Sequence, residues 1–200
     1  TVIKNYNYRL NYSNGYRIPS LKEMYYSFEE HNPPIFGNPN LTPSLSNYYS
    51  LSLESRNSSN SYIELYVNDV DDMISYIVSN DTLMYDNSDK MCLLGLNIAY
   101  QKNLGDMGLQ LFYSFTDGFS NTANGESLLE GISKHGLNMK LNYHIYENMN
   151  IILSARYTSD KYVILFGSDG MKRELEAHII SDLIFINNWR NISFKLGVKN

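Results

Sequence analysis

Four histidines are the side chains of this sequence best suited to bind a metal or move a proton: His31, His135, His144 and His178. None belongs to a catalytic motif, because the chain has no Gly-x-Ser-x-Gly, no His-Glu-x-x-His and no phosphate-binding glycine-rich loop. Ser133 lies two residues before His135, but this spacing alone does not give a nucleophile and its base. The sequence therefore predicts that the protein is not an enzyme.

Two acidic stretches could bind a cation. Residues 68–73 read Asn-Asp-Val-Asp-Asp-Met, and residues 168–170 read Ser-Asp-Gly. Calcium takes several oxygen ligands, so either stretch could contribute to a calcium site. Neither has the spacing of an EF-hand, and charged residues at loop tips are usually solvated. Calcium stays a candidate ligand, and no resident cofactor is predicted.

Alternating side chains indicate the elements that must position these residues. Along 137–143, for example, Leu, Met, Leu and Tyr alternate with Asn, Lys and Asn. A period of two puts one set of side chains on each face of a β-sheet. One face is then aliphatic and aromatic, and the other carries Asn, Ser, Lys, Gln and Gly. No amphipathic helix is predicted.

Strand-like segments cover most of the chain, at about 5–14, 46–56, 60–79, 89–101, 106–117, 134–145, 149–161, 172–186 and 190–199. Short turns are predicted at 57–60, 102–105, 146–148 and 187–189, and long loops at 15–45, 79–88, 118–133 and 162–171. This alternation of short and long connections is typical of an outer-membrane β-barrel. All five prolines lie within 15–45, where a missing N–H does not disturb a strand ladder. The sequence thus predicts an all-β fold, an antiparallel transmembrane β-barrel segment.

Composition limits the class of partner. The 200-residue chain is 43% hydrophobic and 18% charged, with 18 tyrosines and a formal net charge of -5. No nucleic acid is expected as a partner, because neutralising phosphates requires clustered Lys and Arg. The single cysteine, Cys92, excludes an internal disulfide.

A soluble β-sandwich is the alternative architecture, because it also consists of alternating strands and turns. Two observations favour the membrane barrel. The segments reach about ten residues or more, whereas strands usually have about five or six. The polar face is rich in Asn, Ser and Tyr but poor in charge, as expected for a water-filled lumen.

Two boxes in the proline-rich segment resemble the barrel of TonB-dependent outer-membrane receptors. The first is Tyr16-Arg17-Ile18-Pro19, followed by Leu-Lys-Glu-Met-Tyr at 21–25, and the second is Asn38-Pro39-Asn40-Leu41, followed by Pro43. Ser44 stands where the family usually has Glu. Further matches are YVNDVDDMISYI at 66–77, GISKHGLNMKLNY at 131–143 and FKLGVKN at 194–200. The resemblance covers essentially the whole chain.

The resemblance implies a fold and a place within it. The family forms a barrel of about 22 strands around an N-terminal plug. Residues 1–200 would be a single piece of this barrel, about strands 13 to 21, with the plug absent and the 15–45 loop extracellular. Arg17 and Pro19 would serve barrel structure, Arg17 through a pairing inside the wall and Pro19 in a turn. The Asn38-Pro39-Asn40-Leu41 box would open a descending strand.

The same resemblance suggests site residues. In haem receptors of the family a histidine between the two boxes resembles the haem-iron ligand, and His31 stands there. A neutral imidazole on an exposed loop can bind an axial position of ferric haem, and Tyr25, Tyr26 and Phe28 could flank the porphyrin. The alternative is a solvated loop histidine. For His135 the resemblance favours a structural hydrogen bond in the lumen or at the rim over contact with the ligand.

The resemblance also implies an importer and its partners. The family takes up metal chelates across the Gram-negative outer membrane and is energised by the TonB-ExbB-ExbD complex. Haem is the first expected ligand, cobalamin the second, because 66–77 resembles cobalamin receptors, and a ferric siderophore the third. A passive porin or a surface-binding barrel is the remaining alternative. The lipid bilayer and a surface lipoprotein are further expected partners.

Overall fold

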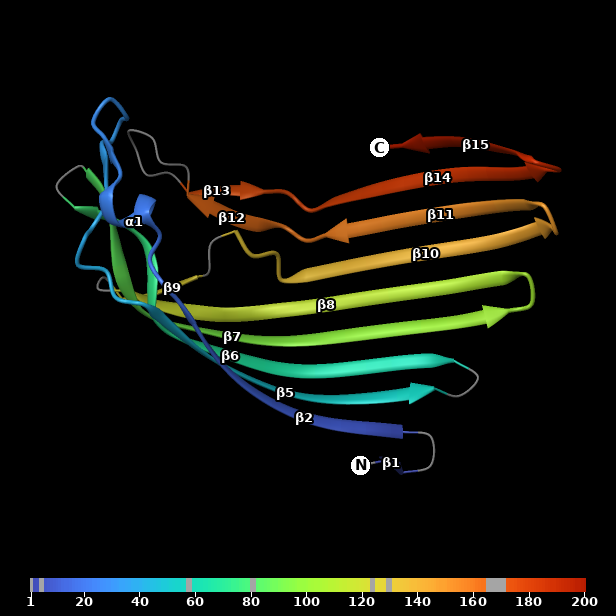
Figure 1. Ribbon diagram of the computed structural model, residues 1–200, viewed down its shortest axis with the longest axis horizontal. Helices are drawn as coiled ribbons and strands as arrows, with labels where there is room; N and C mark the ends of the chain where they lie inside the picture. Colours follow the sequence, from blue (N-terminus) through green and yellow to red (C-terminus); the bar gives the residue numbers. More distant parts are fainter. Residues whose placement is uncertain are drawn as a thin grey trace.

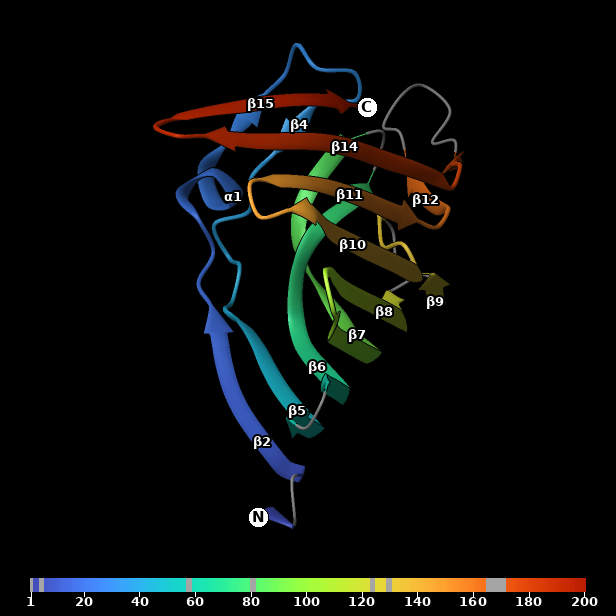
Figure 2. The same ribbon diagram turned by 90° about the vertical axis from the view of Figure 1, so that its right-hand side faces the viewer.

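A computed structural model describes residues 2–3, 6–56, 59–79, 82–122, 125–128, 131–164 and 172–200. These residues form one curved layer of strands, seen from the side in Figure 1 and along the strands in Figure 2. Within them a 13-stranded sheet follows the path β1-β2-β5-β6-β7-β8-β10-β11-β14-β15, and β12 pairs with β13 in a separate two-stranded sheet. The large sheet bends into an open trough and does not close on itself (Figure 2).

The long strands are β2 (Tyr6–Arg17), β5 (Ser44–Arg56), β6 (Asn60–Ser79), β7 (Thr82–Leu104), β8 (Met107–Thr122), β10 (His135–Tyr146), β11 (Met149–Thr158), β14 (His178–Trp189) and β15 (Ile192–Lys199). The short strands are β1 (Val2–Ile3), β3 (Ser27–Phe28), β4 (Ile35–Phe36), β9 (Gly125–Leu128), β12 (Lys161–Ile164) and β13 (Lys172–Leu175). Each predicted segment therefore contains a strand. Consecutive long strands pair antiparallel, as the sequence predicted.

Several predicted boundaries were wrong. The loop predicted at 79–88 is largely a strand pair, in which Met73 pairs with Ser88 and Ser79 with Thr82. The loop predicted at 118–133 contains the end of β8 and all of β9, and the loop predicted at 162–171 contains most of β12. The strand predicted at 172–186 is divided into β13 and β14, and β14 includes the turn predicted at 187–189.

One short helix of the described residues was not predicted from the sequence. Residues Leu21–Tyr25 form the five-residue helix α1, with Ser20 as its N-cap. Five residues are too few for a 3.6-residue period to show in the sequence. No helix of the described ranges is long and apolar enough to cross a membrane.

Short and long connections lie at opposite ends of the sheet. The two-residue turns at 105–106, 147–148 and 190–191 lie at one end, the right-hand end of Figure 1. Helix α1, β9 and the β12–β13 pair lie at the other end. This arrangement confirms the predicted asymmetry of the connections.

The two faces of the sheet differ as their alternation predicted. On β5, Leu51 is 53% exposed, whereas Ser50 beside it, on the opposite face, is 3% exposed. Strand pairing continues each face across the sheet, since Leu51 lies opposite Leu10 and Leu65. Among the described residues no second layer covers this aliphatic face, so the soluble β-sandwich was a wrong alternative.

The buried hydrophobic cluster lies at the long-connection end rather than beneath the sheet. Leu41, Ile74 and Tyr85 form it, with Ile35 packed against them. Leu83, on the same strand face as Tyr85, is 1% exposed. The 18–43 segment therefore packs against the outermost part of β6 and β7, which we call the β6–β7 extension (residues 72–79 and 82–87).

Candidate functional site

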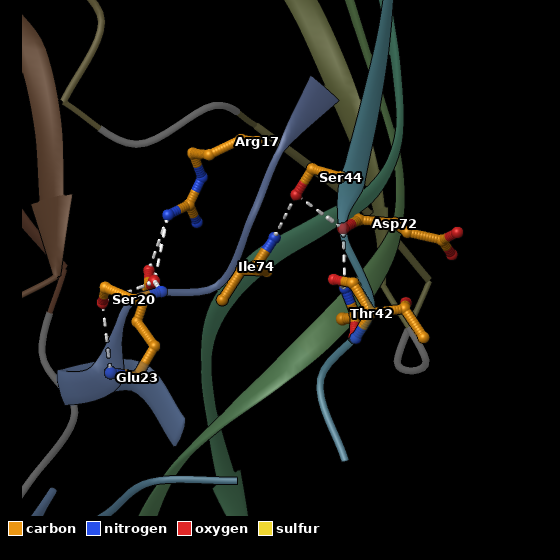
Figure 3. Close-up of polar contacts among 8 residues, drawn as sticks. Arg17, Ser20, Glu23, Thr42, Ser44, Asp72 and Ile74 are labelled. Carbon is orange, nitrogen blue, oxygen red and sulfur yellow. Dashed lines mark hydrogen bonds and ion pairs between the residues drawn. The ribbon is translucent and has the colours of Figure 1, made fainter. Parts of the chain in front are cut away.

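A capping box begins the 18–43 segment. The Ser20 hydroxyl accepts a hydrogen bond from the Glu23 N–H at 3.2 Å, and the Ser20 N–H donates to the Glu23 carboxylate at 2.8 Å (Figure 3). Arg17 Nη1 lies 2.9 Å from the same carboxylate. Arg17 was predicted to pair inside the barrel wall; it instead pairs with α1 at the end of β2. Pro19 lies immediately before the N-cap, where its fixed φ suits the turn into the helix.

Glu23 is the centre of this contact group. Burial alone would raise the pKa of the Glu23 carboxyl, but the hydrogen bonds from Ser20 and Arg17 outweigh burial and hold that pKa below its usual range. The ionised carboxylate thus ties three groups together: the end of β2, the N-cap and the first turn of α1.

Two short strands carry the chain from α1 onto the β6–β7 extension. Strand β3 pairs with β4, and β4 pairs in parallel with β7 through Ile35 and Leu83. The Leu83 N–H donates to the Pro34 carbonyl at 2.7 Å. The returning chain passes close to α1 at Gly37. A Cβ at this position would lie 2.6 Å from the Met24 carbonyl carbon, so only glycine fits there.

Three of the four predicted loop residues come together on this support. The ring of Phe28 lies 6.2 Å from that of Tyr26 and 5.6 Å from that of His31, measured between centroids. We call these three residues the aromatic row. Lys22 Nζ lies 5.1 Å from the Tyr26 centroid, a cation–π distance. Tyr25 on α1 is 65% exposed.

His31 has one nitrogen committed to the backbone. Its Nδ1 lies 2.6 Å from the Pro33 carbonyl oxygen. A carbonyl oxygen only accepts hydrogen bonds, so Nδ1 must carry the proton. In the neutral ring, Nε2 then keeps its lone pair, and this is the tautomer in which a histidine binds a metal through Nε2.

His135 lies on the other face of the sheet from the one expected of a lumen residue. It pairs with Phe115 in the aliphatic row that continues through Leu137 and Tyr113. Its Nδ1 lies 2.8 Å from the Tyr113 hydroxyl, and its ring lies 5.2 Å from that of Phe115. The predicted hydrogen bond exists at the rim, but the lumen position was wrong.

The other two histidines are separate from the aromatic row. His144 Nε2 lies 3.3 Å from the Asn142 amide nitrogen on the polar face of β10. His178 begins β14 rather than lying in mid-strand, with Nδ1 3.4 Å from the Glu176 carbonyl.

The second box anchors the return of the 18–43 segment to the sheet. The Asn38 side-chain oxygen accepts from the Asn40 N–H at 2.9 Å, and Leu41 enters the buried cluster. Pro39 and Asn40 are exposed. The box precedes β5 by two residues, which agrees with its predicted place before a strand.

Sequence patterns missed one polar contact group beside this box, which consists of Thr42, Ser44, Asp72, Ile74 and Asn87 (Figure 3). Thr42 lies just before β5, and the other members lie on β5, β6 and β7, so the group shares no motif spacing. Only their position after a recognised box could have drawn attention to Thr42 and Ser44, and nothing in the sequence pointed to Asn87.

The acidic stretch at 68–73 is part of β6, within the strand predicted at 60–79, and so does not form a loop tip. Asp71 forms an ion pair with Lys90 at 2.8 Å. In the described ranges, no three His, Cys, Asp or Glu side chains are grouped to hold a metal ion. Residues 168–170 lie outside the described residues.

A pocket of about 580 Å³ lies on the polar face of the sheet. Its lining residues come from seven neighbouring strands, β5 to β8, β10, β11 and β14, and include Tyr62, Gln101, Gln110, Asn138, Lys140 and Arg156. Apolar side chains such as Phe112 and Ile180 lie in the same cross-strand rows, so the pocket wall is partly polar and partly apolar.

Comparison with solved structures shows where this fold recurs. The ferric enterobactin receptor of Pseudomonas aeruginosa in complex with enterobactin is 15% identical, with a TM-score of 0.80 over 100% of this chain and 33% of that one. The ferric-catecholate import receptor Fiu of E. coli is 16% identical, with a TM-score of 0.77 over 100% and 29%. The siderophore receptor PirA of Acinetobacter baumannii is 12% identical, with a TM-score of 0.74 over 100% and 35%.

The chain thus spans about a third of the length of these receptors. Its sequence matches the family described as TonB dependent receptor-like, beta-barrel, over residues 1–200. This is a family of transport receptors, in agreement with the prediction that the chain is not an enzyme. Fold, sequence match and the two boxes lead to one conclusion: the chain belongs to the TonB-dependent receptor family and is part of its β-barrel.

Proposed function

We propose that this chain forms wall and rim of an outer-membrane receptor that takes up an iron chelate with energy supplied through TonB. Family membership supports active uptake over a passive porin or a surface-binding barrel. The 18–43 segment would then be extracellular, and the aromatic row would face the incoming ligand. The TonB-ExbB-ExbD complex is the partner implied for the whole receptor, and a surface lipoprotein stays a prediction.

The aliphatic face supports a bilayer as the surrounding medium. Its rows are exposed in mid-strand, as at Leu65, which is 52% exposed. At one edge of the aliphatic band the rings of Tyr12 and Tyr49 lie 5.0 Å apart, and the Tyr12 hydroxyl donates to Asn47 at 3.1 Å. Tyrosines with an apolar ring and a bonded hydroxyl suit the membrane–water interface. We therefore propose the Gram-negative outer membrane as the location.

Haem is the ligand that the geometry favours, and one observation carries this choice. The Nδ1 contact of His31 with the Pro33 carbonyl leaves Nε2 free to bind iron. A hydrogen bond from the other ring nitrogen to a backbone carbonyl orients a metal-binding histidine and raises its basicity. Phe28 and Tyr26 lie beside the imidazole, where aromatic rings can flank a porphyrin.

A ferric siderophore is the second candidate, and a different observation favours it. Lys22 lies over the Tyr26 ring and joins a positive charge to an aromatic surface. An anionic chelate with aromatic groups would match both features. The structural relatives named for enterobactin and catecholate belong to this ligand class. Cobalamin is the third candidate and rests on the resemblance of residues 66–77.

The test is a hemin titration of the full-length receptor in detergent, followed by the Soret absorbance, for the parent protein and the His31→Ala variant. We expect the variant to bind hemin at least about tenfold more weakly, because an axial ligand is lost. His178→Ala is the matched control, since His178 also has Nδ1 near a backbone carbonyl but lies on β14.

Two competitors separate the candidate ligands. The siderophore would be favoured if ferric enterobactin displaces hemin. The affinity for ferric enterobactin should then be lowered by Lys22→Ala and not by His31→Ala. Cyanocobalamin that binds tightly where hemin does not would favour cobalamin. Equal hemin affinity in the parent and in His31→Ala would remove the proposed iron ligand.

A further inference from the structure

The 18–43 segment is held at its far end by the carboxamide of Asn87 on β7. The Asn87 side-chain oxygen accepts from the Thr42 N–H at 2.8 Å. Its amide nitrogen donates to the Thr42 carbonyl at 3.0 Å and to the Asp72 carbonyl at 2.8 Å. One side chain thus joins the backbone before β5 to the backbone of β6.

Ser44 makes a second link at the same point. Its hydroxyl donates to the Asp72 carbonyl at 2.8 Å and accepts from the Ile74 N–H at 3.3 Å (Figure 3). The β6–β7 ladder skips Asp72, whose φ is 53°, so its carbonyl is available to both side chains. Asp72 is therefore the place where the returning segment joins the β6–β7 extension.

Asn87 lies in line with the residues that bury the segment. Leu83, Tyr85 and Asn87 are alternate residues of β7 and share one face. Leu83 and Tyr85 are both buried, and Tyr85 packs with Leu41 and Ile35 of the segment, but hydrophobic contact has no direction and permits sliding. Hydrogen bonds from one amide to three backbone groups are directional and fix the register.

We propose that Asn87 is a positioning residue for the ligand site. It fixes the register of the 18–43 segment on the β6–β7 extension, and the β7–β4–β3 pairings pass that register to the aromatic row. The row then has one arrangement before ligand arrives, which lowers the ordering cost of binding. The effect of Asn87 on ligand binding rests on the proposed function. Its effect on the order of the 18–43 segment does not.

The ordering is tested without ligand, on full-length receptor with Cys92→Ser and spin labels at Glu30→Cys and Asp106→Cys. Glu30 lies in the exposed 18–43 segment, and Asp106 in an exposed turn at the opposite end of the sheet. Pulsed electron resonance gives the distribution of distances between the labels. We expect a narrow distribution for the parent and at least a twofold broader one for Asn87→Ala.

Two further variants make the result specific. Asn191→Ala removes an exposed asparagine from the β14–β15 turn and should leave the distribution narrow. Asn87→Asp keeps an acceptor for Thr42 but loses both donors, so it should broaden the distribution partially even if Asn87→Ala fails to fold. A distribution as narrow as the parent's in a folded Asn87 variant overturns the inference.

Ligand titration then distinguishes this inference from the proposed function. Hemin or ferric enterobactin should bind Asn87→Ala at least about fivefold more weakly than the parent. If the parent binds neither compound, the proposed function fails. The distance measurement then still shows whether Asn87 orders the 18–43 segment. If the parent binds and Asn87→Ala binds equally, Asn87 does not position the site.

Discussion

At the scale of single residues, the inner wall depends on one glycine. The ring of Tyr66 lies across the strand pair over Gly95, stacked 5.7 Å from the Tyr48 ring. The Tyr66 hydroxyl lies 2.9 Å from the Thr116 hydroxyl two strands away. A Cβ on Gly95 would lie 2.0 Å from the Tyr66 ring, so the ring position requires glycine.

Gly95→Ala should therefore displace Tyr66 and destabilise the receptor by about 1–3 kcal/mol, the usual cost of overpacking. Thermal unfolding of the full-length protein in detergent measures this change. In a Tyr66→Ser background, where the ring is gone, the same substitution should cost close to nothing. An equal cost in both backgrounds would show that Tyr66 is not what Gly95 accommodates.

Residue roles were only partly accessible from the sequence. Counting back by two from Leu137 puts His135 in the aliphatic row, so its face was already implied by the alternation. His31 was selected through its position between two boxes, but its tautomer depends on a contact with Pro33 that only folded geometry gives. No sequence pattern indicates the role of Asn87, because the backbone groups that its side chain binds lie 15 and 45 residues away in the chain.

At the scale of elements, α1 depends on its cap. An isolated helix of five residues is not stable, because the entropy lost in forming the first turn exceeds the stabilisation from the hydrogen bonds of one turn. The reciprocal Ser20–Glu23 hydrogen bonds and the Arg17 ion pair supply what the helix lacks. All of these contacts to the carboxylate are strongest when Glu23 is ionised.

Acidification should consequently loosen α1. Because the pKa of Glu23 is lower in the folded state than in the unfolded state, its contribution is complete above the unfolded value of about 4.3. This contribution of Glu23 to the stability of α1 is lost as the pH falls through the lower pKa that Glu23 has in the folded state. A spin label at Leu21→Cys, in a Cys92→Ser background, should become mobile over that range, and a Glu23→Gln variant should show no such transition. A transition that persists in Glu23→Gln would assign the loosening to another group.

The long strands were predictable because each keeps a period of two over many residues. The β6–β7 extension was not, because Asp86, Asn87 and Ser88 have the composition of a turn. Asn87 bonds to the backbone of Thr42, and Asp86 accepts from the Asn38 side chain, so both partners lie in the 18–43 segment, which is distant in sequence. Strands of two residues such as β3 and β4 are shorter than any pattern that alternation can reveal.

At the scale of the whole molecule, one layer of strands separates an apolar face from a polar one. Leu65 lies in mid-band on the apolar face, opposite Leu51 and Leu96. Gln110 lies on the polar face beside the pocket. If lipid covers the first face and water the second, charge should be tolerated very differently at these two positions.

Leu65→Arg should lower the free energy of unfolding in lipid vesicles by about 2–4 kcal/mol, the cost of an arginine near the bilayer midplane. Gln110→Arg should change it little. Urea titration of the full-length receptor in vesicles measures both. Equal tolerance of arginine at the two positions would contradict a bilayer around the aliphatic face.

Strand β7 has 23 residues, or about 76 Å of extended chain. A tilted strand crosses a bilayer with about 9–11 residues, so roughly half of β7 has no lipid to cross. With β6 it forms a stiff projection that carries the segment between the two boxes. If the orientation proposed above holds, this projection stands on the outer surface of the cell, where an antibody that binds it would test that orientation directly.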